Sequence, residues 1–101
     1  MAAWLIVTVV LHDRAAFMSG YSPAAAKVVE RFGGRFIVRG GGTEVLEGDG
    51  VPGSSQIVIE FPDAATARAF WDDPEYRAAK ALREGVCDMS VVLVAAPPPA
   101  A

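Results

Sequence analysis

The sequence contains one cysteine, Cys87, and one histidine, His12. A single cysteine cannot form a disulfide within the chain, and one cysteine with one histidine cannot supply a zinc cluster. The same scarcity argues against a cysteine–histidine or serine–histidine–aspartate catalytic set. We therefore predict no metal site and no cofactor, and we interpret Cys87 as a small buried hydrophobic residue.

Clusters of lysine and arginine are also absent, as are long hydrophobic runs. The net charge is −3 and the pI is near 5.0, whereas a nucleic-acid-binding surface needs clustered positive charge. Although 52% of the residues are apolar, no run approaches the ~20 that a membrane-spanning helix needs. The apolar start of the chain lacks the basic residues and the cleavage site of a secretion signal. We therefore expect a cytoplasmic protein with no nucleic-acid and no membrane partner.

The length of 101 residues corresponds to one domain, which we assign to residues 1–96. Residues 97–101 read PPPAA. Consecutive prolines cannot continue a strand ladder, so they predict an extended, flexible tail.

Residues 3–11 (AWLIVTVVL) predict a strand in which both faces are apolar. Thr8 is its only polar member. A strand with one face in water would alternate apolar with polar residues, so both faces of this strand must be covered. Helices can cover one face, but the chain is too short to cover the other as well. This missing cover predicts an oligomer.

Apolar residues at helical spacing predict a helix from Asp13, its N-cap, to Gly33, where a glycine ends it. We expect a kink or restart at Ser22-Pro23, with Ser22 as a second cap. Asp63 and Asp73 are predicted to cap two further helical segments, and residues 90–95 (SVVLVA) predict a final buried strand.

Glycines at 41 and 42 predict a two-residue hairpin turn, because glycine tolerates positive φ at both central positions. This turn would place Arg39 opposite Glu44, Val38 opposite Val45 and Ile37 opposite Leu46. A third short strand, residues 56–61, would follow the glycine-rich connection of residues 48–55.

The predicted order is therefore one strand, a helix, three short strands, a second helical region and a last strand. This order is typical of the α+β ferredoxin-like split βαβ sandwich, an antiparallel sheet with its helices on one face. The bare face needs a partner, and a second copy supplies it most simply. We predict a homodimer through this sheet face.

Several motifs, in order along nearly the whole chain, resemble the bacterial domain of unknown function 1330 family. They are Gly33–Gly41, Glu44–Gly48, Val58–Pro62, Phe70-Trp71, Pro74–Tyr76 and Leu82-Arg83. The resemblance implies the dimeric α/β-barrel superfamily, in which two ferredoxin-like units pair their sheets. That superfamily includes cofactor-free monooxygenases, lactone isomerases, chlorite-dismutase-like haem proteins and stress-response proteins. The family has no agreed reaction, so the resemblance implies a fold and an assembly but no substrate.

Arg39 is the leading candidate for ligand binding, since a guanidinium can grip a carboxylate with two parallel hydrogen bonds. We expect it to share a strand face with Ile37. A cross-strand ion pair with Glu44 is the alternative. His12 and Glu60 are the candidates for proton transfer. His12 could equally be an exposed loop residue, and Glu60 could pair with Arg35.

Tyr21, Trp71 and Tyr76 are candidate pocket residues, and packing in the core is the alternative for all three. Two functions stay open. The first is binding of a small acidic molecule, with a cofactor-free monooxygenase- or isomerase-like enzyme as its catalytic form. The second is a non-catalytic dimeric structural or stress-related module with no ligand.

Overall fold

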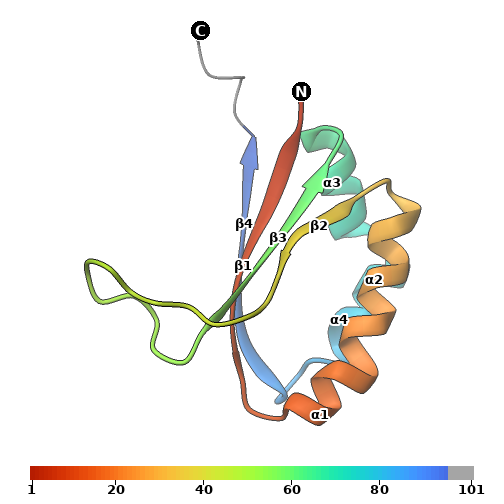
Figure 1. Ribbon diagram of the computed structural model, residues 1–101. Helices are drawn as coiled ribbons and strands as arrows, with labels where there is room; N and C mark the ends of the chain where they lie inside the picture. The colour runs from red at the N-terminus through yellow and green to blue at the C-terminus, as the bar shows by residue number, and fades with distance from the viewer. Residues whose placement is uncertain (96–101) are drawn as a thin grey trace, which may run out of the picture.

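The computed structural model describes residues 1–95, and the tail predicted for residues 97–101 lies outside them. Strand β1 (Ala3–Leu11) is central, because it pairs antiparallel with β3 (Ser55–Phe61) on one side and with β4 (Cys87–Ala95) on the other. Strand β2 (Arg35–Arg39) completes the sheet in the order β2-β3-β1-β4. All the helices lie on one face of this sheet (Figure 1). The predicted ferredoxin-like α+β fold is confirmed.

The helices are α1 (Arg14–Ala16), the π-helical turn η1 (Phe17–Tyr21), α2 (Ser22–Arg31), α3 (Ala64–Asp72) and α4 (Pro74–Ala81). The predicted caps at Asp13 and Asp63 are confirmed, since their carboxylates accept hydrogen bonds from backbone N–H groups three residues on, at 3.0 and 2.7 Å. Gly33 ends α2 as predicted, with φ of 71° and its N–H donating to Glu30.

The predicted cap at Ser22 is wrong. Tyr21 already has helical dihedrals, and the Ser22 N–H donates to the carbonyl of Phe17, the i to i+5 bond of a π turn. The helical path therefore continues through this wider turn into the first turn of α2, where Pro23 is tolerated. No restart, and hence no side-chain cap, is needed.

The predicted hairpin at Gly41-Gly42 is also wrong. Residues 40–54 form no strand, and β2 pairs directly with β3, with Arg39 opposite Ile57. A strand from the 43–47 segment could pair only with β2, whereas β3 pairs with both β2 and β1 and so buries more apolar surface. The connection instead leaves Leu46 88% exposed. It extends to the side of the sheet opposite the helices (Figure 1).

The core lies between the sheet and the helices. Alternate residues of β1 point into it, and its centre is an aromatic group in which the ring of Phe70 lies 5.1 Å from that of Phe61 and 4.4 Å from that of Tyr76. Cys87 is partly buried at the start of β4, three residues before the predicted start, and burial raises the pKa of its thiol. Cys87 thus packs against the core as a protonated thiol.

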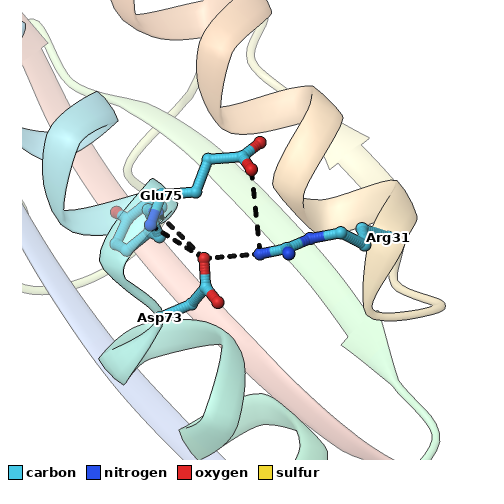
Figure 2. A network of polar contacts seen from close by, with 4 residues as sticks. Arg31, Asp73 and Glu75 are labelled. Carbon is cyan, nitrogen blue, oxygen red and sulfur yellow. Dashed lines mark hydrogen bonds and ion pairs between the residues drawn. The ribbon is translucent and has the colours of Figure 1, made fainter.

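Asp73 joins helices α2 and α4 (Figure 2). Its carboxylate caps α4 as predicted, accepting from the N–H of Glu75 at 2.9 Å, and it also pairs with the guanidinium of Arg31 at the end of α2. Only 15% of its side chain is exposed. Helices α2 and α4, distant in sequence, are therefore tied at one carboxylate.

We expect Asp73→Ala to lower the free energy of unfolding by about 1–2 kcal/mol, since it removes a cap worth ~1 kcal/mol and an ion pair worth ~0.2–1 kcal/mol. Asp73→Asn is the matched control, because asparagine retains the cap and loses only the charge. Urea denaturation at one fixed protein concentration measures both variants. An asparagine variant as unstable as the alanine variant would show that the ion pair, and not the cap, is what matters.

The sheet face opposite the helices is uncovered. Its apolar side chains come from the even-numbered positions of the central and last strands: Trp4, Ile6, Val10, Val92 and Val94. Val92 is 54% exposed and Val94 39% exposed. Both faces of β1 are thus apolar, as the sequence indicated, and the chain covers one of them. Within residues 1–95, no helix is long and apolar enough to cross a membrane.

Candidate functional site

A pocket of about 190 Å³ lies between the helices and the sheet. Its walls are mostly apolar, formed by the odd-numbered residues of β1, by Ile57 and Ile59 of β3, and by Phe17 of η1. Its lining residues with hydroxyl or guanidinium groups are Arg14, Tyr21, Ser22, Arg39, Ser55 and Tyr76. Arg39, Tyr21, Trp71 and Tyr76, the four candidates for ligand binding, all line this one pocket.

A β-bulge sets the direction of Arg39. The register of β2 against β3 shifts between Phe36, which faces Ile59, and Val38, which faces Val58. The shift leaves Ile37 as an extra residue without a partner on β3. As a result, Phe36 and Arg39 both lie on the helix side of the sheet, where both line the pocket. The Arg39 guanidinium lies over the Phe36 ring, 4.2 Å from its centroid.

Two predictions about Arg39 are therefore wrong. The strict alternation expected for β2 fails, because the bulge lets Arg39 share the helix side of the sheet with Phe36. Arg39 forms no cross-strand pair with Glu44, because Glu44 lies in the irregular connection and not on a neighbouring strand. Within residues 1–95, Arg39 has no carboxylate within ion-pair distance.

Arg14 is a second cation of the pocket, and it is not among the residues predicted from the sequence. It is the first residue of α1, just after the C-terminal end of β1, and its side chain is exposed. It forms no ion pair with any of the described residues. Nothing in its sequence context separates it from an ordinary surface arginine. The π turn and the bulged strand β2 thus both contribute residues to the lining of the pocket.

The buried end of the pocket holds two tyrosine hydroxyls. Tyr21, from η1, and Tyr76, from α4, lie 2.8 Å apart oxygen to oxygen, and both side chains are buried. Burial first, and then the neighbouring Tyr76, raises the pKa of Tyr21 well above its usual value. Both the core and the pocket interpretations of these tyrosines hold, since each packs on other rings and also lines the cavity.

The two candidates for proton transfer lie elsewhere. His12 follows β1 and is half exposed, with its Nε2 2.8 Å from the carboxylate of Asp88. Glu60 points to the uncovered sheet face, where it accepts from the indole N–H of Trp4 at 3.1 Å and pairs with Arg35 at 3.0 Å. The Arg35 alternative for Glu60 is thus observed. Neither residue lines the pocket.

The geometry therefore combines cations at an open end, an apolar middle and hydroxyl donors inside. No histidine or carboxylate is among the pocket residues, so no ordinary general base faces the cavity from the described part of the chain. Across residues 1–95, no three His, Cys, Asp or Glu side chains gather as metal ligands would. The arrangement is suited to holding an anion with an apolar body.

A model of the family "Domain of unknown function (DUF1330)" matches residues 2–97. The chain belongs to the DUF1330 family. This result confirms the resemblance noted in the sequence, and it adds no reaction. Among functionally curated proteins, none matches the DUF1330 chain.

Several solved structures resemble the DUF1330 chain. A protein of unknown function from Rhodopseudomonas palustris is 23% identical, with a TM-score of 0.76 over 97% of this chain and 84% of that one. A dimeric ferredoxin-like protein of unknown function from Jannaschia sp. CCS1 is 18% identical, with a TM-score of 0.67 over 95% and 100%. SnoaB of Streptomyces nogalater, a cofactor-independent oxygenase, is 15% identical, with a TM-score of 0.66 over 97% and 95%. At these identities the likeness shows the fold alone.

Proposed function

We propose that this DUF1330 chain binds a small acidic molecule in the pocket between its helices and its sheet. The observation that carries the proposal is the pair of arginines, Arg14 and Arg39, at the edge of an apolar cavity with no carboxylate partner among residues 1–95. A guanidinium without a protein partner can pair with a ligand carboxylate, and the apolar walls can hold the rest of the molecule.

We propose further that the working form is a homodimer paired through the uncovered sheet face. That face carries exposed apolar side chains, including Val92 and Val94, and contiguous exposed apolar patches mark interaction sites in soluble proteins. The related Jannaschia protein, which covers the same length, is described as dimeric. Leu46, in the connection that extends to the same side, adds further apolar surface. The cytoplasmic location stays a prediction.

A thermal-shift titration with phenylacetate tests the binding proposal. Saturation at about 100 times the dissociation constant should add ~2.7 kcal/mol to the free energy of unfolding. Phenylacetamide is the matched control, because it has the same size and lacks the negative charge. We expect the acid to raise the melting midpoint and the amide to have little effect. Equal shifts for both compounds, or none for either across a panel of small carboxylic acids, would contradict the proposal.

A cofactor-free enzyme is the second candidate function. The Tyr21–Tyr76 hydroxyl pair supports it, because buried neutral hydroxyls can donate to an oxygen that gains negative charge during a reaction. SnoaB, of similar fold, is a cofactor-independent oxygenase. His12 and Glu60 remain the candidates for proton transfer, but their distance from the pocket favours binding over catalysis. The module without a ligand is less well supported, because the Arg39–Glu44 pair that would have filled this space is absent from the described residues.

A further inference from the structure

The buried tyrosine pair has one hydrogen-bond donor left over. Each phenol carries one O–H donor, and a bond between two phenols uses only one of them. Tyr21 and Tyr76 bond to each other at 2.8 Å, and among residues 1–95 no other side chain and no backbone carbonyl accepts from either oxygen. One O–H is therefore left without an acceptor, on two buried residues that line the pocket. Leaving a buried donor unused is costly, so a ligand oxygen placed there would gain a full hydrogen bond.

The tyrosine pair keeps this hydrogen-bond donor available and holds it in a fixed position. Burial raises the pKa of Tyr21 above its usual value, so the Tyr21 hydroxyl stays protonated at neutral pH. Both rings are fixed by their neighbours: the Tyr21 ring lies 5.3 Å from that of Phe17, and the Tyr76 ring lies 5.4 Å from that of Trp71. The hydroxyl is thus held in place before any ligand arrives, which lowers the entropic cost of using it.

The volume of the pocket limits the body of the ligand. A protein cavity of ~150 Å³ lined by apolar side chains holds one benzene molecule. The present pocket, at about 190 Å³, therefore has room for one aromatic ring and a few further atoms, well below the ~300–1,000 Å³ of sites for drug-sized ligands. Aromatic walls at Phe17, Phe70 and Trp71 suit a flat ring.

The cations and the hydroxyl pair lie at different depths. Arg14 and Arg39 are exposed, whereas Tyr21 and Tyr76 are buried. A ligand that satisfies both must carry its carboxylate on one side of the ring and an oxygen acceptor on the other. Two polar contacts at opposite ends of an apolar ligand would fix the orientation of the ligand and would also select its negative charge.

We propose that the pocket selects single-ring aromatic monocarboxylic acids that bear a hydroxyl or carbonyl oxygen on the side of the ring opposite the acid. The carboxylate pairs with Arg39 and Arg14, and the far oxygen accepts from the Tyr21–Tyr76 pair. This selection rests on the proposed function, since it requires that the pocket binds acids at all.

Calorimetric titration with 4-hydroxyphenylacetate and with phenylacetate tests the selection. For the wild-type chain we expect the hydroxylated acid to bind about 3- to 10-fold more tightly, the usual worth of one hydrogen bond. The double variant Tyr21→Phe/Tyr76→Phe should bind the two acids with equal affinity. It should also fold, because replacing both partners of a buried hydrogen bond with apolar groups of the same shape is nearly neutral.

The outcomes separate the two proposals. Equal wild-type affinities for the two acids, or a preference that survives in the folded double variant, would overturn the selection and leave acid binding in place. If neither acid binds the wild-type chain, both proposals fail together. Should the double variant fail to fold, the single variants decide: the preference must fall in at least one of them, and its retention in both would overturn the selection.

Discussion

Replacing Val92 with glutamate is expected to convert the proposed dimer into a monomer. Val92 lies on the edge strand β4, opposite Ile6 of the central strand β1 on the uncovered sheet face, and is 54% exposed in the single chain. A two-fold interface would bury this position in both copies, so each dimer would enclose two carboxylates without partners. The penalty for burying an unpaired ion is roughly several kcal/mol. Sedimentation velocity at micromolar concentration measures the change directly.

Leu82→Glu is the matched control for this experiment. Leu82 follows α4 and is 50% exposed, so the two variants add the same charge at similar exposure, one on the sheet face and one away from it. We expect the Leu82 variant to remain a dimer. A monomeric wild-type chain, or a Val92 variant that sediments as the wild type does, would contradict the sheet-face assembly.

Arg39→Ala is expected to weaken binding of phenylacetate by about 10- to 150-fold, the usual worth of a hydrogen bond to a charged group. Its effect on stability should be small. The side chain is exposed and makes no ion pair among residues 1–95, and its contact with the Phe36 ring at 4.2 Å is worth ~0.5–1 kcal/mol. Calorimetric titration and thermal unfolding of the same preparation separate the two effects.

Glu44→Ala is the control for Arg39. It removes a charge that the sequence placed beside Arg39 and that the structure places in the connection before β3. We expect this variant to bind phenylacetate as the wild type does. If Arg39→Ala lowers stability and leaves affinity unchanged, Arg39 is a structural residue and the pocket loses its leading cation.

The features that the sequence predicted well depend on local signals. Asp13, Asp63 and Asp73 each precede a helical pattern and need only the next three residues to act as caps. Strand β1 was clear because every position but Thr8 is apolar on both faces. From these elements and their order alone, the ferredoxin-like sheet with helices on one face could be derived.

The features that the sequence missed depend on competition between distant segments. The turn at Gly41-Gly42 was compatible with a hairpin, but β2 gains a better partner in β3, which also pairs with β1. Strict alternation placed Arg39 on the same face as Ile37, and the bulge that turns it appears only once the register against β3 is known. The bond between Tyr21 and Tyr76 joins residues 55 apart, so neither residue alone predicts it.

The most direct test of acid binding is a nuclear magnetic resonance titration of the ¹⁵N-labelled chain with phenylacetate. The amides of Gly40 and Gly41, which line the open end of the pocket beside Arg39, are sensitive reporters, and Tyr21 reports on its interior. We predict that these resonances shift in a saturable manner, with the largest changes confined to residues around the pocket. A titration to millimolar acid that leaves them unmoved, or that shifts only residues of the uncovered sheet face such as Val92, would contradict the account.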